Sequence, residues 1–400
     1  MPVMRQDSLL RLAPESSVSN PVRVLHAVGH LSRGGIERWV FQLACHTNPV
    51  HIEHHVLVRT TEEEPFTRQF RDAGINVVSC TGVTSPLRFA QNFKRVLAQH
   101  GPFDVVHAHG VSMFTVETLL LARLIGIRAR ILHAHNDLRP RLAHASLLYK
   151  IYTALNLRLL RKLSNKGLAC GAQAAEWSFG HRWLSRKPRI DLMTGIDMRR
   201  CLQPAAVGLR EELGLPTDRF IVAQVGRFTI AKNHDFTLRI AKELAARGCP
   251  CHFLLIGDGE LRKQIVEGAA LEGLAGNFTF VPDASDVPRI LRGAVDVQIL
   301  PSIHEGLPLV LLEGQASGVL SLVSDTVTRE GVVDSSLVSF LPIDRGADLW
   351  ADAIVRSIAT KRNLEDDALF RERMLKSRFN IEQNAVAMTD LYRAMARSTA

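Results

Sequence analysis

Short apolar segments alternate with amphipathic helical patterns along almost the whole of this 400-residue chain. Strands separated by helices need crossover connections, which produce largely parallel sheets covered on both faces. The pattern therefore predicts an α/β fold with two Rossmann-like, doubly wound domains. In the first half, the expected strands are 22–28, 55–58, 75–79, 105–108, 130–134 and 167–170, and the expected helices are 36–46, 66–73, 88–99, 113–125 and 143–163. In the second half, the expected strands are 220–225, 253–256, 278–281, 295–300 and 321–323, with helices such as 235–247 and 261–270 between them.

The division into domains follows from the length and from one polar, irregular segment. A chain of 400 residues exceeds what one hydrophobic core usually supports. Residues 198–218 contain Pro204, Gly208, Gly214 and Pro216 and interrupt the alternation. We expect a loose N-terminal tail (1–20), a first domain (21–197), a linker (198–218), a second domain (219–379) and a C-terminal helix (380–400). The domains would face each other across a cleft, with ligands at the carboxyl ends of the strands.

The composition is that of an ordinary globular protein that works in a reducing compartment. No apolar run reaches the roughly 18 residues that a bilayer span needs. The first 20 residues lack the apolar core of a signal peptide. The six cysteines are scattered, and the pair Cys249 and Cys251 is too closely spaced to form half of a zinc site without partners. We expect a reduced, cytoplasmic protein.

Positive charge is concentrated in the first half of the chain. Residues 1–200 carry 27 Lys and Arg against 14 Asp and Glu, and residues 123–200 carry 16 against 4. Within that region, residues 149–162 place apolar and basic side chains at helical spacing. This stretch is either a core-packed helix with a solvated basic face or a surface that docks on anionic lipid at the inner face of the membrane. Nucleic acid is disfavoured as a partner, because aromatics are sparse among these basic residues.

The segment after the apolar run 295–300 has the residues expected of a sugar–phosphate site. A helix is expected to begin near Pro308, because the fixed φ of proline suits a first helical position. Glu305, Gly306 and Leu307 precede that start, and Glu313 lies inside the helix. Free backbone N–H groups at a helix start favour a phosphate, and the two carboxylates could accept sugar hydroxyls on either side of it.

Two further loops follow strands and carry candidate phosphate contacts. Arg227 and Lys232 come after the strand 220–225, where a guanidinium and an ammonium can hold a diphosphate. Gly34 and Gly35 follow the first strand and permit a tight turn close to a ligand, without the G-x-G-x-x-G spacing of a dinucleotide site. Each loop could also be only a solvated turn. Because no Asp-x-Asp sequence occurs, protein charges would have to replace a divalent metal.

Two His-x-His pairs end strands of the first half: His107 with His109, and His133 with His135. Alternation along a strand puts each pair on one face of the sheet, which raises the possibility of a metal site. No carboxylate or cysteine completes a familiar ligand set, so we predict no metal site. One histidine of each pair is expected in or behind the core, and His135 is expected at the mouth of the cleft.

Taken together, these motifs resemble the retaining GT-B glycosyltransferases of family 4 (group 1), near the capsule and exopolysaccharide branch. The resemblance covers roughly residues 22–395. One departure is Thr194, where the family usually has Asn before Gly. The matching motifs are Val24-Leu25-His26, Gly34-Gly35, 105–109, 133–136, 194–197, Gly226-Arg227, Lys232-Asn233-His234, 254–259 and Glu305…Glu313.

The resemblance assigns roles to individual residues. Glu305 would contact the hydroxyls of the donor sugar, and Glu313 the ribose of the nucleotide. Arg227 and Lys232 would hold the diphosphate, with the Gly34-Gly35 loop approaching it from the opposite domain. His135 would lie against the donor sugar near the reacting centre, and residues 283–287 near the base. Gly306 and Leu307 complete the binding loop, and His135, Glu305, Arg227 and Lys232 would carry the reaction.

The implied reaction transfers a sugar, with retention, from a nucleotide sugar (UDP- or GDP-linked) to a glycan or lipid-linked acceptor, without a further cofactor. A front-face route, in which the leaving phosphate assists deprotonation of the acceptor, fits the lack of an evident carboxylate nucleophile. Two alternatives remain open from the sequence. One is a nucleotide-sugar epimerase on the same fold, and the other is a non-catalytic, basic protein that binds membrane surfaces.

Overall fold

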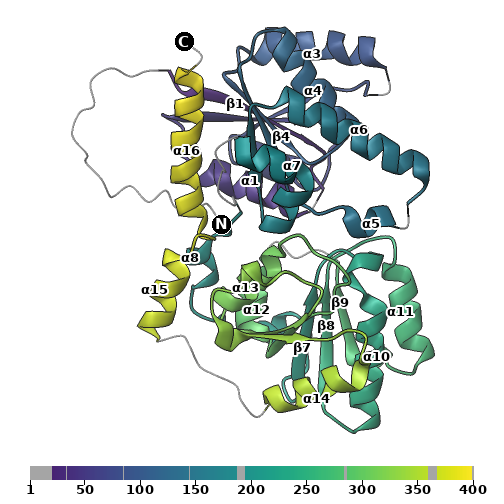
Figure 1. The fold of residues 1–400 in the computed structure, drawn as a ribbon. Coiled ribbons are helices and arrows are strands. Elements are labelled where there is room, and N and C mark those ends of the chain that lie inside the picture. Colours follow the sequence, from purple (N-terminus) through teal and green to yellow (C-terminus); the bar gives the residue numbers. More distant parts are fainter. Residues whose placement is uncertain are drawn as a thin grey trace.

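Two six-stranded, wholly parallel sheets form the centres of two domains in the computed structural model, which describes residues 20–32, 34–83, 85–143, 145–186, 194–282, 286–358 and 367–398 (Figure 1). The strand orders are β3-β2-β1-β4-β5-β6 and β12-β11-β10-β7-β8-β9. Both follow one plan, because in each the first strand of the domain pairs with the second and the fourth. The predicted α/β fold with two Rossmann-like domains is confirmed. The tail expected at 1–20 lies, except for Asn20, outside the described residues.

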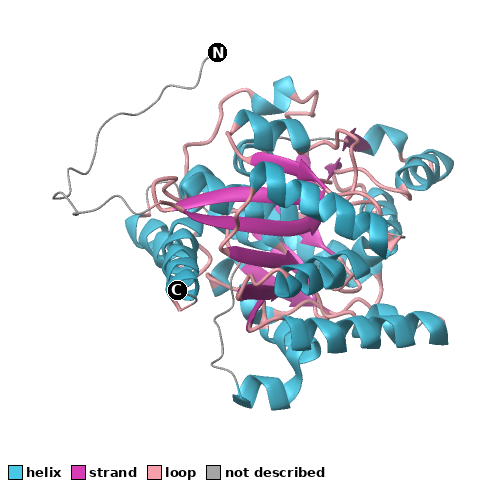
Figure 2. Cartoon of the chain, turned by 90° about the horizontal axis from the view of Figure 1, so that it is seen from above, coloured by secondary structure: helices cyan, strands magenta, loops and turns pink. Residues whose placement is uncertain are grey.

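The first domain consists of a parallel sheet with helices on both of its faces (Figure 2). In β4 all five residues are buried, as expected for a central parallel strand. The strands are β1 (Val22–Gly29), β2 (Ile52–Val58), β3 (Asn76–Ser79), β4 (Val105–His109), β5 (Ala129–Ala134) and β6 (Lys166–Ala169). The helices are α1 (Gly35–His46), α2 (Thr67–Asp72), α3 (Pro86–His100), α4 (Met113–Leu124), α5 (Arg139–Ala143), α6 (Leu147–Leu163) and α7 (Ala172–Arg186).

The second domain repeats this arrangement around a core that includes Phe236, Phe253 and Trp350. Its strands are β7 (Phe220–Val225), β8 (Cys251–Ile256), β9 (Phe278–Val281), β10 (Val297–Leu300), β11 (Leu320–Ser324) and β12 (Val338–Leu341). The helices from the linker onward are α8 (Met198–Cys201), α9 (Leu209–Glu212), α10 (His234–Ala246), α11 (Arg262–Leu271), α12 (Val287–Ala294), α13 (Leu309–Ala316), α14 (Ala347–Ile358) and α15 (Ala368–Lys376).

The last helix, α16 (Ile381–Arg397), returns to the first domain and packs against α1 (Figure 1). Asn380 caps its start by accepting from the N–H of Glu382 at 3.2 Å. Its buried Tyr392 hydroxyl lies 2.7 Å from Nδ1 of His107 on β4. The chain that leads into α16 passes the turn at Gly195 and Ile196, where the Ile196 N–H donates to the oxygen of Phe379 at 2.9 Å. The C-terminal segment therefore ties the end of the first domain to the second.

Three expected helical features differ in the structure. The helix expected at 143–163 begins four residues later, at Leu147, because Ser146 caps α6 by accepting from the N–H of Tyr149, and Ala143 is the last residue of α5. The linker expected to be irregular contains α8 and α9, and Leu209 of α9 is buried in the core of the second domain. Pro308 is the N-cap of α13, so the helix begins one residue later than the proline rule suggested. The predicted helix start near Pro308 is confirmed to within one residue.

Candidate active site

The predicted site residues lie at the carboxyl ends of both sheets, where the two domains meet. Gly34 and Gly35 connect β1 to α1, and His135 follows β5. From the second domain, Arg227 and Lys232 follow β7, and the Glu305 loop follows β10. These strands lie at or beside the points where the strand order reverses, which is where α/β folds bind ligands.

Lys232 and Glu305 form an ion pair, although 73 residues separate them. Glu305 Oε1 accepts from Lys232 Nζ and from the Ser302 hydroxyl, the latter at 2.8 Å. The Lys232 backbone is fixed because its carbonyl accepts from Gln224 Nε2 at 2.8 Å. The two side chains are mostly buried, with 20% and 13% exposed, so little water screens the pair. The structure thus brings together one predicted phosphate contact and one predicted sugar contact.

The Glu305–Gly306 loop touches the His135 loop directly across the domain boundary. A methyl group on Gly306 would stand 2.6 Å from the backbone oxygen of His135. Beside it, His304 Nε2 donates to the backbone oxygen of Asp137 at 2.7 Å. Gly306 is therefore needed for close approach, and Leu307 next to it is buried in a core that both domains share.

Glu313 is enclosed rather than open to the cleft. Only 3% of its side chain is exposed, and Arg38 Nη1 of α1 donates to its Oε1 at 2.6 Å. Arg38 belongs to the first domain, so this ion pair joins the domains on the buried side of the site. A ribose that binds Glu313 has to share that carboxylate with Arg38 or displace it.

Glu37, next to Arg38, is a buried carboxylate at the glycine-rich turn. Burial raises the pKa of Glu37, while hydrogen bonds from its own backbone N–H and from the Ser32 hydroxyl, together with the charge of Arg227, oppose that rise. A methyl group on Gly34 would come within 2.4 Å of Glu37 Oε2, so an alanine there would force the Glu37 carboxylate to shift. Arg227 itself is exposed, and its charge acts on Glu37 from the second domain.

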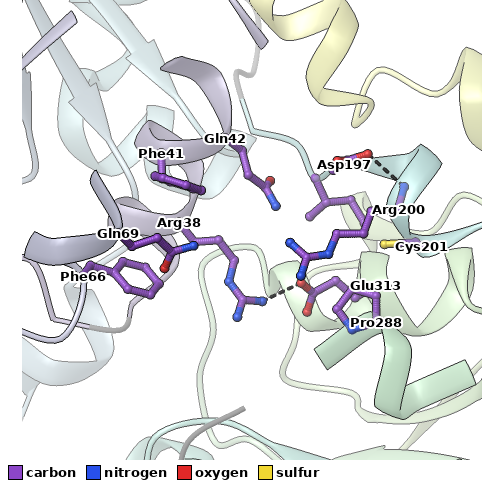
Figure 3. Close-up of a pocket in the computed structure, with 11 residues that line it drawn as sticks. Arg38, Phe41, Gln42, Phe66, Gln69, Asp197, Arg200, Cys201, Pro288 and Glu313 are labelled. Carbon is purple, nitrogen blue, oxygen red and sulfur yellow. Dashed lines mark hydrogen bonds and ion pairs between the residues drawn. The ribbon is translucent and has the colours of Figure 1, made fainter. Parts of the chain in front are cut away.

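A pocket at the same boundary is lined by both domains and by α8 (Figure 3). Arg38 points into it toward Glu313, and Arg200 of α8 approaches from the other side (Figure 3). Its volume of about 70 Å³ is smaller than a nucleotide sugar requires. Of the predicted site residues, only Glu313 lines this pocket, so it lies beside the Lys232–Glu305 pair and is not the predicted donor site.

The His-x-His pairs are more buried than expected. His107, His109 and His133 are all buried, and His135 is partly exposed. Burial lowers the pKa of His135 to about 3, so the imidazole is neutral at pH 7. The structure also brings His26 of β1 within 4.8 Å of His107 and His109, and His109 is equally close to His133 and His135. One histidine of each pair was expected in or behind the core. In the first pair both histidines, His107 and His109, are buried, which is one more than expected.

Two family models match the chain, one in each domain. The model described as "Glycosyl transferase 4-like domain" matches residues 34–192, and that described as "Glycosyl transferases group 1" matches residues 208–366. The Bacillus subtilis (strain 168) protein named "Putative glycosyltransferase EpsF" is 30% identical over 383 residues, which cover 94% of this chain and 97% of that protein. The chain belongs to the group 1 glycosyltransferases. The exopolysaccharide branch that the motifs resemble stays a prediction.

Other relatives agree over parts of the chain or in fold alone. The Escherichia coli "UDP-Gal:alpha-D-GlcNAc-diphosphoundecaprenol alpha-1,3-galactosyltransferase" is 28% identical over 50% of this chain and 52% of that protein. Among solved structures, the Thermosynechococcus elongatus sucrose-phosphate synthase matches with a TM-score of 0.73 at 19% identity, covering 94% of this chain and 100% of that one. Anabaena HepE in complex with UDP-glucose matches with a TM-score of 0.63 at 16% identity, covering 94% and 98%. The last two show the shared GT-B fold.

Membership in this family makes the chain a glycosyltransferase, in preference to the epimerase and the non-catalytic surface protein. The roles of Glu305, Glu313, Arg227, Lys232, and His135 stay predictions. Residues 283–285 of the expected base-binding edge lie outside the described residues. Sequence reasoning missed Glu37 and Arg38, although the glutamate lies two residues after the Gly34-Gly35 pair and could have been noticed there.

Proposed function

We propose that this glycosyltransferase moves a sugar, with retention and without a bound metal, from a UDP- or GDP-sugar to a lipid-linked glycan. The observation that carries the proposal is the Lys232–Glu305 pair, held opposite His135 at the carboxyl ends of the two sheets. The named relatives support it, since one acts on a diphosphoundecaprenol-linked sugar and one holds UDP-glucose.

In this proposal the donor rearranges the Lys232–Glu305 ion pair when it binds. A diphosphate that reaches Lys232 competes with Glu305 for the ammonium. Glu305 can then accept hydrogen bonds from hydroxyls of the donor sugar, while the hydrogen bond from the Ser302 hydroxyl holds the carboxylate in position. Breaking the anomeric C–O bond adds negative charge to the diphosphate, and Lys232, Arg227 and the N–H groups at the start of α13 stabilise that charge. The leaving phosphate then assists deprotonation of the acceptor on the same face.

The donor site is tested by a binding and turnover screen against UDP-, GDP- and ADP-sugars, with and without EDTA. We expect one nucleotide sugar to bind in EDTA and to be hydrolysed slowly without acceptor. Glu305→Gln should abolish that hydrolysis, and Lys263→Gln, at an exposed position on α11, should leave it unchanged. Binding that needs added metal contradicts the metal-free proposal, and formation of a new sugar nucleotide contradicts transfer. A covalent glycosyl–enzyme contradicts the front-face route.

Contact with the anionic inner face of a membrane forms the second part of the proposal. Among the described residues, no helix combines the length and apolar character needed for a membrane span. α6, however, leaves a row of apolar side chains exposed on the face turned away from its buried residues, flanked by exposed Lys150, Arg158 and Lys162. The apolar residues and their exposed fractions are Leu147 72%, Leu148 80%, Ile151 47%, Tyr152 40%, Leu155 56% and Leu159 44%. Apolar side chains flanked by cations match an anionic lipid surface.

Sedimentation with vesicles tests this contact. We expect binding to phosphatidylglycerol-containing vesicles and little binding to pure phosphatidylcholine. Leu148→Ser with Leu155→Ser should weaken binding, whereas Leu271→Ser, at a still more exposed leucine on α11, should not. Equal binding of all three proteins would remove α6 from the proposal and leave the donor site untouched.

A further inference from the structure

Four imidazoles form a continuous chain of nitrogen–nitrogen contacts inside the first domain. His54 Nδ1 lies 2.9 Å from His26 Nε2, His26 Nδ1 lies 3.1 Å from His109 Nε2, and His109 Nδ1 lies 3.0 Å from His135 Nε2. The histidines come from β2, β1, β4 and the end of β5, which are neighbours in this order in the sheet. This histidine chain therefore crosses four of the six strands of the sheet and ends at the cleft.

The surroundings keep these rings neutral and out of water. His26, His54 and His109 are buried, and burial lowers the pKa of each ring below its ordinary value. Trp39 of α1 and Tyr392 of α16 cover this face of the sheet, with centroids about 6 Å from rings of the cluster. No carboxylate is among the groups of described residues that could hold a metal here.

The number of protons on the four neutral rings determines which tautomers they can adopt together. A neutral imidazole has one N–H and one bare nitrogen. Each of the three contacts needs one proton, and four neutral rings supply four. One proton is left, and it must be on an end nitrogen, either His54 Nε2 or His135 Nδ1. All four rings must also share one tautomer, because a reversal at any ring would set two N–H groups or two bare nitrogens against each other.

The buried end of the chain decides between the two arrangements. His54 Nε2 is buried and has no hydrogen-bond partner among the described residues. An N–H group buried without an acceptor is rarer in proteins than an acceptor left without a donor. The last proton is therefore better placed at the partly exposed cleft end. There, a water molecule or a ligand oxygen can accept from it.

We propose that His54, His26 and His109 are positioning residues that hold His135 neutral with its proton on Nδ1, so that it donates a hydrogen bond to an oxygen of the donor sugar. The ligand oxygen rests on the proposed function, but the tautomer does not. His135 then acts as a hydrogen-bond donor and not as a general base. Taking up a proton would place a positive charge on buried rings among which the described residues contribute no carboxylate.

A metal ion is the competing occupant of this cluster. His26, His107 and His109 could supply three nitrogens, and His107 Nε2 is buried without a hydrogen-bond partner among the described residues. However, an ion bound there needs one nitrogen from His26 and one from His109, and the histidine chain already uses both nitrogens of each ring. It also places two positive charges in a buried site where the described residues contribute no carboxylate. The three nitrogen contacts therefore favour the proton chain.

The tautomers are measured by long-range ¹H–¹⁵N correlation spectra of the full chain labelled with ¹⁵N-histidine, assigned by single substitutions, without substrate. We expect Nδ1–H at all four positions and no stoichiometric metal by elemental analysis. His26→Phe breaks the histidine chain and should let His135 populate both tautomers, with turnover reduced about twofold where the two tautomers are equally populated.

His107→Phe is the matched control, since this ring is equally buried beside the chain and hydrogen-bonds to Tyr392 instead. His135 should keep its tautomer in this variant. Nε2–H at His135 in the unaltered protein, an unchanged His135 tautomer in His26→Phe, or stoichiometric bound metal each overturn the proposal. Correct tautomers in a protein that transfers no sugar would contradict the proposed function alone.

Discussion

Mild acid should destabilise the first domain far more than the second. Burial lowers the pKa of His54, His135 and His234 to about 3. It also lowers the pKa of His26, His107 and His109 well below the ordinary value. Five of these six histidines belong to the first domain, and His234 belongs to the second.

The direction of the pH effect on stability follows from the pH at which each imidazole takes up a proton in the folded and in the unfolded state. In the unfolded chain histidine titrates near 6.5, so between pH 7.5 and 5.5 the unfolded state gains protons that the folded state does not. The free energy of unfolding therefore falls with falling pH. The loss is about 1.4 kcal/mol per buried ring over this interval, or roughly 7 kcal/mol for five rings and about 1.4 for one. His46, whose pKa is raised by its hydrogen bond to Asp197, opposes this by less than one such step. A loss of roughly 7 kcal/mol is comparable to the whole stability of a domain.

Hydrogen–deuterium exchange at pH 7.5, 6.5 and 5.5, corrected for intrinsic rates, separates the two domains. Protection of β1, β4 and β5 should collapse by pH 5.5, while protection of β7 and β8 should persist. His107→Phe should reduce the loss in the first domain by about 1.4 kcal/mol, and His234→Phe should change only the second. Equal protection of both domains at pH 5.5 would refute the claim that these imidazoles are buried as neutral groups.

Three substitutions test the site itself. Lys232→Met should lower kcat by roughly 10²–10³, because it removes a cation that meets the charge of the leaving diphosphate; initial rates at saturating donor measure it. Gly306→Ala places a methyl group against the backbone of the first domain and should lower both turnover and thermal stability. Gly276→Ala, where a methyl group meets nothing within 4 Å, is its control. Arg38→Ala leaves Glu313 buried without its ion pair and should cost roughly 1–3 kcal/mol in urea unfolding. Adding Glu313→Gln should recover part of that loss, and no recovery would argue against the pair.

Most of the fold was predictable because parallel strands covered on both faces are continuous apolar runs. The elements that were missed lack that signal. β12 is at the edge of its sheet and is only partly buried, with the exposed Ser339 inside it. α8 and α9 have four residues each, too few for a helical period to appear. The break between α5 and α6 depends on one capping serine in an otherwise helical pattern.

Site residues could be predicted where charged side chains directly follow strands. They could not be predicted where a side chain depends on a partner in the other domain. Lys232 and Glu305 both follow strands that the topology makes adjacent, so their meeting could be foreseen. Arg38 is one of 49 cations in the chain and lies inside an amphipathic helix. Its partner Glu313 is 275 residues away, and only the docking of the two domains brings them together.

The histidine chain also could not be predicted from the sequence, although the His-x-His spacing placed each pair on one face of the sheet. His26 and His54 join that face only because β2 and β1 precede β4 and β5 in the sheet order. The useful signal was that four neighbouring strands, or their ends, each carry a histidine on the same side.

The two domains contribute different groups to the proposed reaction, charged ones from the second domain and a neutral one from the first. The second domain supplies the charges, Arg227, Lys232 and Glu305, on the side where the diphosphate gains negative charge. The first domain supplies His135, which burial keeps neutral. Glycosyl transfer passes through a sugar with positive charge at its anomeric carbon, and a cation beside that carbon raises the barrier. A neutral hydrogen-bond donor can orient the sugar without that cost. We infer that the burial of the imidazoles, which makes the first domain sensitive to acid, also keeps positive charge away from the reacting centre.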